Sequence, residues 1–326
     1  GALDPKQIRQ AQGILASASA AERVSVVESV SRALWCDDAL ELDRIASELG
    51  CASETEVKAA LAFGNSRRSE LKHYSGAMFY YGGEWYWGVD RLYHLEQRLT
   101  DLKVDREAGA PMLAPRQDIN WGDVPSDGSL TMEIYVSLRS PYSAVIYDRA
   151  VKLAKDSGVA LSVRPVLPMV MRGVPATPMK GLYIFMDAAR EARALGVDYG
   201  NFSDPIGEPA RRCYSLYPWA EVEGKGSELI SSFLRHAFAL GVSTLADKGL
   251  QKVVEAAGLD WQVAKKHLGE TGWESLLEEN RIAMYGAGCW GVPSFRLLDA
   301  TGAPIVTLWG QDRLWVIARE IRKQLA

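Results

Sequence analysis

The sequence predicts an α/β protein that holds one complete domain and part of a second copy of it. Three patterns carry this prediction: a strand–helix–strand unit over residues 132–166, a strand–strand–helix unit over 293–324, and a six-residue segment that occurs twice. Between the two units, residues of about 180–287 have the apolar spacing of helices. The 326 residues are 48% hydrophobic and 24% charged, which is typical of a globular chain long enough for two domains.

Composition and cysteine spacing exclude several classes of function. A net charge of −4 offers no basic surface to a phosphate backbone, so we expect no nucleic acid partner. No stretch approaches the roughly 18 consecutive apolar residues of a membrane helix, so we expect no membrane partner. The four cysteines, Cys36, Cys51, Cys213 and Cys289, are too far apart for a C-x-x-C redox pair or a metal-binding pair. We therefore expect a cytoplasmic protein without a bound metal.

The N-terminal region is predicted to be helical first and to end in a hairpin and a helix. Capping-box pairs such as Ser53 with Glu56 indicate helices over 5–72, because they satisfy the free N–H groups of a first turn. Two aromatic runs over 76–87 flank a Gly-Gly pair, which is typical of a β-hairpin. A helix is expected next, over about 89–102.

A linker separates this region from a complete domain. Residues 105–128 carry prolines and glycines with few periodic apolar positions, which is linker composition. In the domain that follows, 129–326, the first strand leads into a helix that Ser140-Pro141 opens, and a second strand follows over 160–166. Such a crossover favours a parallel pair of strands.

The two regions share a repeated segment. Trp-Gly-Val-Asp-Arg-Leu at 87–92 returns as Trp-Gly-Gln-Asp-Arg-Leu at 309–314, each time between an aromatic hairpin and an amphipathic helix. The spacing is too long for a solenoid repeat and fits a duplicated domain. We therefore expect residues 1–104 to be an incomplete, degenerate copy of 129–326, whose missing front half would precede Gly1.

The order of elements in the second region is that of a thioredoxin fold with a large helical insertion. In this layout the start of the first helix, Ser140-Pro141-Tyr142-Ser143, faces Val292-Pro293 at the third strand. Redox members of the fold have cysteine at the first and fourth of those helix positions. This chain has serine at both, so its own side chains cannot exchange disulfides there. Because a helix start lowers the pKa of a thiol brought to it, we expect the thiol of a cofactor at this place.

Three places in this layout are candidate ligand contacts. The Ser140 hydroxyl could donate to a thiolate, although serine before proline is also an ordinary helix cap. A cis bond at Val292-Pro293 would turn the backbone of Val292 toward the helix start, where it could pair with a peptide-like ligand. Asp312 and Arg313 begin the last helix, and their alternative interpretation is a solvated carboxylate beside an exposed arginine.

Together these features resemble the kappa-class glutathione transferases and the 2-hydroxychromene-2-carboxylate isomerases, within the DsbA-like thioredoxin superfamily. The resemblance covers residues of about 130–325 in order and spacing. The matching motifs are Ser-Pro-Tyr-Ser at 140–143, Arg-Pro-Val at 164–166, Lys-Gly-Leu-Tyr at 180–183, Gly-Val-Pro at 291–293 and Trp-Gly-Gln-Asp-Arg-Leu at 309–314. The sequence departs from the kappa enzymes at 170–173, which is Val-Met-Arg-Gly where they have a Gly-Asn pair.

The resemblance implies glutathione as the cofactor. It assigns the glutathione sulfur to Ser140, the cysteinyl backbone to Val292 before Pro293, the γ-glutamyl end to Asp312 and Arg313, and the glycyl carboxylate to Lys180. It further implies that the thiolate adds to a conjugated aromatic substrate, permits rotation about the former double bond and leaves. In the transferase version the adduct is the product.

The sequence therefore predicts a glutathione-dependent isomerase or transferase in aromatic compound degradation, with Ser140 as catalytic residue and a small aromatic electrophile as substrate. The alternative is a non-catalytic DsbA-like binding or scaffold protein with a degenerate site. The chain is expected to pair as a homodimer or to pair its two copies internally. Asp90 and Arg91 of the first copy are then packing or pairing residues, because that copy lacks the proline and the serine-bearing helix start of a complete site.

Overall fold

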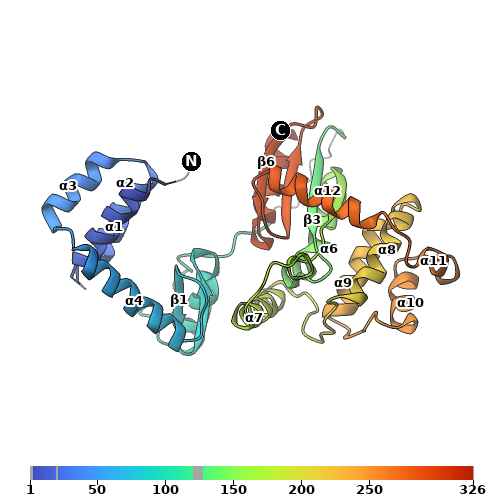
Figure 1. The fold of residues 1–326 in the computed structure, drawn as a ribbon, viewed down its shortest axis with the longest axis horizontal. Helices are drawn as coiled ribbons and strands as arrows, with labels where there is room; N and C mark the ends of the chain where they lie inside the picture. Colours follow the sequence, from blue (N-terminus) through green and yellow to red (C-terminus); the bar gives the residue numbers. More distant parts are fainter. Residues whose placement is uncertain (1–2, 20, 120–127, 326) are drawn as a thin grey trace. The chain divides into compact units, whose positions relative to one another are not determined.

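The computed structural model describes residues 3–19, 21–119 and 128–325 of the chain. It divides into two compact units, Gly1–Trp85 and Tyr86–Ala326, which we describe separately (Figure 1).

The N-terminal unit contains four helices. They are α1 (Pro5–Ser17), α2 (Arg23–Trp35), α3 (Ala39–Leu49) and α4 (Glu54–Glu70). The first three pack around a small core that includes Ile14, Val30, Leu42 and Ile45. The predicted capping box of Ser53 and Glu56 is present at the start of α4, although α4 itself buries no residue. The predicted hairpin follows as β1 (Met78–Tyr81) and β2 (Glu84–Trp87), which form a two-stranded sheet.

A four-stranded sheet organises the C-terminal unit. Its strands are β3 (Thr131–Val136), β4 (Ala160–Pro165), β5 (Ser294–Leu298) and β6 (Pro304–Trp309). The order is β4-β3-β5-β6, with β3 parallel to β4 and antiparallel to β5, and β5 antiparallel to β6. Helix α6 (Pro141–Ser157) crosses from β3 to β4, and α13 (Leu314–Leu325) follows β6. The predicted thioredoxin arrangement is therefore confirmed.

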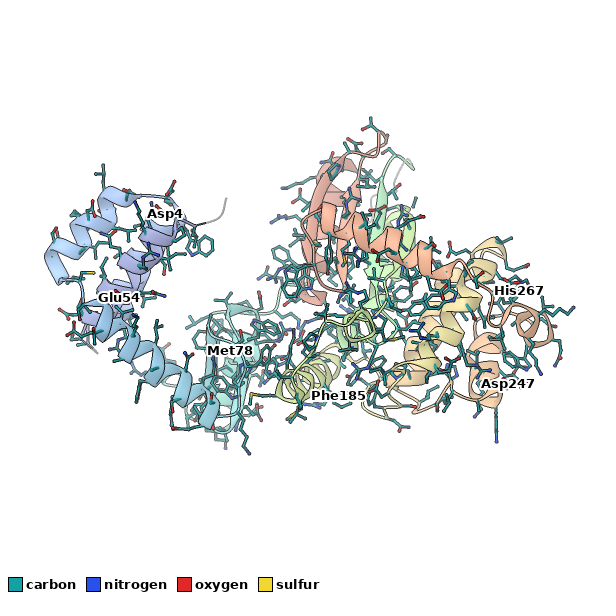
Figure 2. The ribbon with its side chains drawn as sticks, in the orientation of Figure 1. Asp4, Glu54, Met78, Phe185, Asp247 and His267 are labelled. Carbon is teal, nitrogen blue, oxygen red and sulfur yellow. The ribbon has the colours of Figure 1, made fainter. Side chains whose placement is uncertain are left out.

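The predicted insertion between β4 and β5 is confirmed as a helical region. Its helices are α7 (Pro178–Leu195), α8 (Glu208–Val222), α9 (Gly226–Phe238), α10 (Asp247–Ala256), α11 (Trp261–His267) and α12 (Trp273–Gly286). Helix α8 packs against α9, and α9 packs against α10 and α6. Ile134 and Phe295 of the sheet share one apolar core with Phe233 of α9. Figure 2 shows side chains filling the space between these helices.

A carboxylate lies in the central strand because two arginines compensate it. Glu133 on β3 is buried, and its oxygens accept hydrogen bonds from Arg164 on β4 at 2.9 Å and from Arg296 on β5 at 2.8 Å. A buried charge is tolerated only where it is paired and hydrogen-bonded. The three residues therefore connect β4, β3 and β5 across the sheet.

The division between the units falls before the linker that the sequence predicts. The turn η1 (Val89–Arg91) and the helix α5 (Leu92–Asp101) belong to the C-terminal unit, whereas the sequence groups them with residues 1–104. The reason is an ion-pair network around Arg91, whose partners all lie beyond residue 180. Of the predicted linker 105–128, residues 120–127 lie outside the described part of the chain.

Among the described residues, no helix has the length and apolar character needed to cross a bilayer.

We expect Ile134→Ala to lower the free energy of unfolding of the C-terminal unit by about 2–5 kcal/mol, because it removes fully buried methyl groups from the central strand. Urea unfolding of the whole chain followed by fluorescence measures this loss. The matched control is Val222→Ala on α8, whose side chain is 86% exposed and whose loss should stay within about 0.5 kcal/mol. Equal effects of the two substitutions would contradict this assignment of the core.

Candidate functional site

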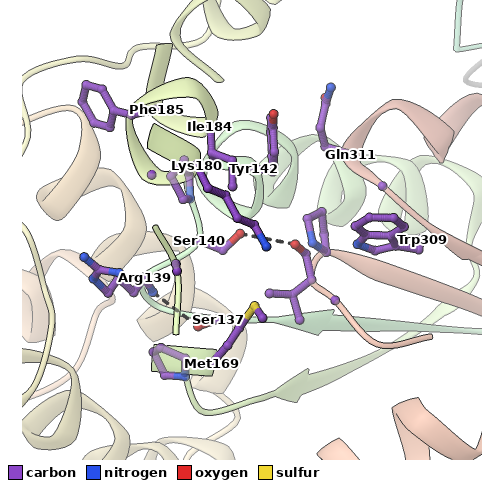
Figure 3. Close-up of a pocket in the computed structure, with 18 of the residues that line it drawn as sticks. Ser137, Arg139, Ser140, Tyr142, Met169, Lys180, Ile184, Phe185, Trp309 and Gln311 are labelled. Atoms are coloured by element: carbon purple, nitrogen blue, oxygen red, sulfur yellow. Dashed lines mark hydrogen bonds between the residues drawn. The ribbon is translucent and has the colours of Figure 1, made fainter. Parts of the chain in front are cut away.

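A cavity of about 590 Å³ lies within the C-terminal unit. It is formed by the start of α6, the turn η2 (Met169–Arg172), α7, the loop before β5 and the turn η3 (Gln311–Arg313) (Figure 3). Residues of the 87–91 segment also line it. The six site residues predicted from the sequence are all in its wall: Ser140, Lys180, Val292, Pro293, Asp312 and Arg313.

Ser140 caps helix α6 and also faces the cavity. Its side-chain oxygen accepts a hydrogen bond from the backbone N–H of Ser143 at 3.1 Å, and Pro141 occupies the first helical position. The capping role considered from the sequence is therefore confirmed, and the same residue lies in the wall of the cavity. Ser143, the other position where redox members have cysteine, is fully buried and does not line the cavity. Only the first of the two serines is placed to meet a ligand.

The Val292-Pro293 bond is cis, as the sequence predicts. The Ser140 hydroxyl donates to the carbonyl oxygen of Val292 at 3.5 Å, so this backbone lies directly beside the helix start (Figure 3). Gly291 precedes it, and a Cβ at that position would lie 2.7 Å from Nε1 of Trp309. The close approach of backbone and indole explains why glycine is needed there. Cys289 is buried beside Tyr135 and Met284 and belongs to the core there.

Positive charge gathers at the Ser140 end of the cavity. The start of α6 presents free N–H groups and the positive end of the helix dipole. Lys180, in the first turn of α7, points toward Ser140 (Figure 3). Arg139 also lines the cavity, but its guanidinium is paired with Asp204 at 2.7 Å. Lys180 and the helix start are therefore the groups best placed to attract an anion.

The wall of the cavity also holds two reciprocal ion pairs. Arg91 donates to Asp312 at 2.8 Å, and Arg313 donates to Asp90 at 2.7 Å. All four residues line the cavity. Asp90 and Arg91 are thus pairing residues, as expected from the sequence, but their partners are the corresponding residues of the second copy of the motif. Asp312 and Arg313 are paired within the protein and are not a freely solvated pair.

Arg91 is the centre of a buried network that sequence reasoning did not find. Its Nε donates to Asp187 on α7 at 2.9 Å, and the Tyr142 hydroxyl donates to the same carboxylate at 2.7 Å. Glu191, one turn further along α7, lies 3.6 Å from Arg91. Burial on its own would lower the pKa of Arg91, but the charges of Asp187, Glu191 and Asp312 outweigh it and hold this pKa well above its usual range.

One signal in the sequence could have found part of this network. Asp187 and Glu191 are four residues apart, so they share a face of α7, and their neighbours on that face are Ala188 and Ala192, which are fully buried. Two acids on a buried helix face require a cationic partner. Arg190, three residues beyond Asp187 on the same helix, is one such partner at 2.7 Å. The buried partner, Arg91, is 96 positions away along the chain, which no local pattern indicates.

Glu191 also binds the helix α5 and the predicted linker that follows it. It accepts hydrogen bonds from His94 at 2.7 Å and from Arg116 at 2.8 Å, and a further one from Tyr93. Burial would raise the pKa of Glu191, but the His94 hydrogen bond and the charges of Arg91 and Arg116 hold it far below its usual range. Burial lowers the pKa of His94, so the imidazole is predominantly neutral at neutral pH.

One buried polar atom in the cavity wall is unsatisfied. Gln311 donates its amide N–H to Glu191 at 2.5 Å, while its Oε1 has no hydrogen-bond partner among the described residues. Buried acceptors of this kind are rare in folded proteins.

Comparison with known proteins identifies the domain. A model of the DSBA-like thioredoxin domain matches residues 131–322. Similar solved structures include a 2-hydroxychromene-2-carboxylate isomerase, which is 19% identical, with 60% of this chain and 95% of that chain covered and a TM-score of 0.49. Another is the cytosolic disulfide reductase DsbM from Pseudomonas aeruginosa with GSH, at 16% identity, 60% and 98% coverage and a TM-score of 0.44. No curated protein matches the sequence.

We expect the C-terminal unit to lose stability as the pH falls. Glu191 and His94 both have lowered pKa values in the folded state, so the unfolded chain binds more protons in acid. The loss begins below the ordinary pKa of histidine, 6.5, and continues below that of glutamate, 4.5. Urea unfolding of the whole chain at about pH 8, 6, 4 and 3, values that lie on both sides of the two ordinary pKa values, measures how steeply the free energy of unfolding falls with pH.

The variant Glu191→Gln tests the origin of this slope. It is expected to be less stable at pH 8 but to lose less stability between about pH 4.5 and 3, since no carboxylate titrates at that position. The exposed Glu223→Gln on the same unit is the control and should keep the wild-type slope. An unchanged slope in Glu191→Gln would show that other groups cause the acid sensitivity.

Proposed function

The chain belongs to the DSBA-like thioredoxin family, and we propose that its C-terminal domain is a glutathione-dependent isomerase or transferase acting on a small aromatic electrophile such as 2-hydroxychromene-2-carboxylate. The observation that carries the proposal is the Ser140 hydroxyl at the start of α6, beside the cis Val292-Pro293 bond. Here the fold stabilises a thiolate electrostatically, while the protein offers no thiol of its own.

The residues present fit glutathione at both ends of the cavity. The Ser140 end has a hydroxyl donor, a helix start and an ammonium group, which suit a thiolate and a terminal carboxylate. The other end has carboxylates and guanidinium groups from Asp90, Asp312 and Arg313, which suit the ammonium and carboxylate of an α-amino acid.

Each residue then has one role. Ser140 donates its O–H to the sulfur, and the α6 start favours the charged form of the thiol. Val292 pairs through its backbone with the cysteinyl residue, and Lys180 neutralises the glycyl carboxylate. Asp312 accepts the γ-glutamyl ammonium, and Arg313 donates to its carboxylate. When bound, glutathione supplies a thiolate nucleophile that is regenerated in an isomerisation or leaves with the product in a transfer.

The indole rings in the cavity wall favour an aromatic substrate. Trp290 and Trp309 lie with their ring centroids 4.6 Å apart, and their side chains remain 52% and 40% exposed. Trp87 also lines the cavity and contacts Tyr183 edge to face. Exposed aromatic faces around a concave site bind flat apolar rings well.

All four cysteines are unpaired thiols, which agrees with the reducing cytoplasm that we propose as the location.

Titration calorimetry with glutathione tests the cofactor. We expect the wild-type protein to bind it, and we expect Ser140→Ala to raise the pKa of the bound thiol by about 1–2 units, because a hydrogen bond to a charged group is worth about 1.5–3 kcal/mol. The ultraviolet absorbance of the thiolate, followed against pH, measures this pKa. Ser143→Ala is the matched control, since that serine lies one turn away and outside the cavity.

The absence of glutathione binding by the wild-type protein would refute the cofactor. Equal thiol pKa values in the wild-type protein and Ser140→Ala would remove the catalytic role of Ser140. Binding without turnover of any aromatic enone or aryl halide would favour the alternative of a non-catalytic binding protein.

A further inference from the structure

The two ion pairs that Asp90, Arg91, Asp312 and Arg313 form in the cavity wall have the pattern of a two-fold interface. Asp90 corresponds to Asp312 in the repeated motif, and Arg91 corresponds to Arg313. The contact of Asp90 with Arg313 is therefore matched by the contact of Asp312 with Arg91. Reciprocal contacts between equivalent residues are characteristic of the symmetric interface between two copies of one protein. Here both halves of the interface come from one chain.

The two motifs also have similar local structure. Gly88 and Gly310 both have positive φ, at 52° and 120°, a region that favours glycine. Each is followed by a short 3-10 turn, η1 or η3, and then by a helix, α5 or α13. The preceding tryptophans, Trp87 and Trp309, both line the cavity. The correspondence therefore extends from the sequence to the backbone and to the position of the side chains.

We propose that residues 86–102 act as an in-chain substitute for a second copy of the domain and complete the end of the cavity that reads an α-amino acid group. In this role Arg91 is the positioning residue of Asp312, and Asp90 is the positioning residue of Arg313. The inference rests on the proposed function, because glutathione carries its α-amino acid group on the γ-glutamyl residue.

The burial of the two pairs supports this division of roles. The Arg91 side chain is only 5% exposed, and Asp187 holds it from α7, so its orientation is set by the protein. It fixes one oxygen of Asp312, whose side chain keeps 18% of its surface exposed. Asp90 and Arg313 are more open, at 37% and 32%. Asp90 and Arg313 can therefore reach a ligand. The Arg91 guanidinium keeps the Asp312 carboxylate in a fixed orientation.

Charge balance points to the class of ligand. Asp90, Asp312, Arg91 and Arg313 carry two negative and two positive charges, so this end of the cavity attracts neither a simple anion nor a simple cation. A zwitterion presents one charge of each sign, and it matches a carboxylate beside a guanidinium. The preferred group is therefore the α-ammonium and α-carboxylate of an amino acid.

The test compares glutathione with glutaryl-cysteinylglycine, which lacks only the α-ammonium group. Calorimetric Kd values for both are measured on the full chain. We expect the wild-type protein to bind glutathione with a Kd roughly tenfold lower or more, because the analogue loses the hydrogen bond between its ammonium group and the Asp312 carboxylate. In Arg91→Lys the preference should fall at least about threefold, because lysine keeps the charge but cannot hold two carboxylates in a fixed fork.

Two further variants separate positioning from general stability. Asp90→Asn, at a partly exposed position, loosens Arg313, which meets the α-carboxylate. It should therefore reduce the preference for glutathione over 4-aminobutyryl-cysteinylglycine, which lacks only that carboxylate, while the Kd for this analogue stays within about twofold. The control Asp101→Asn lies at the exposed end of α5 and should leave all three Kd values unchanged. A merely structural role for the segment would weaken glutathione and both analogues equally.

The outcomes distinguish this inference from the proposed function. If the wild-type protein binds neither ligand, the glutathione proposal fails and the inference fails with it. If it binds both without preference, or if Arg91→Lys and Asp90→Asn retain the wild-type preference, the in-chain substitute is refuted and glutathione binding stands. A selective loss of preference in these two variants, with Asp101→Asn unaffected, supports the inference.

Discussion

The buried guanidinium of Arg91 is the interaction on which the geometry of the cavity depends. It compensates Asp187 and Asp312, with Glu191 within range, and through Asp187 it is linked to Tyr142 at the start of α6. Removing one partner of a buried ion pair costs several kcal/mol, because the remaining charge is left without compensation. Helix α7, the turn η3 and the start of α6 must therefore keep their places around this one side chain.

This requirement explains why the compact C-terminal unit begins at Tyr86. The most deeply buried cation that the acids of α7 contact, Arg91, lies on a segment outside the family match at 131–322. Residues 86–102 are consequently part of the domain in energetic terms, although composition alone groups them with the helices that precede them. The paired motifs also bring Trp87 into the wall of the same cavity as Trp309.

The site has the helix start at which redox members of the fold stabilise a thiolate, but it has serine there in place of cysteine. Ser140 holds the position at the helix start where a thiolate is stabilised, and the helix dipole acts on whichever thiol is brought there. Because a hydroxyl cannot form a disulfide, the useful property that remains is anion stabilisation. Lys180 and the mixed charges around Asp312 line the same cavity, which agrees with the glutathione binding that we propose.

Local chemistry in the sequence determined the elements and most of the cavity wall. The Ser140-Pro141 cap, the Val292-Pro293 dipeptide and the repeated Trp-Gly-x-Asp-Arg-Leu motif are recognisable because capping, proline geometry and motif identity depend on adjacent residues. The tertiary structure alone decided the place of Arg91 and the boundary at Tyr86. An ion pair between residues 96 or 221 positions apart leaves no periodicity in the sequence, and its energy exists only when folding removes both groups from water.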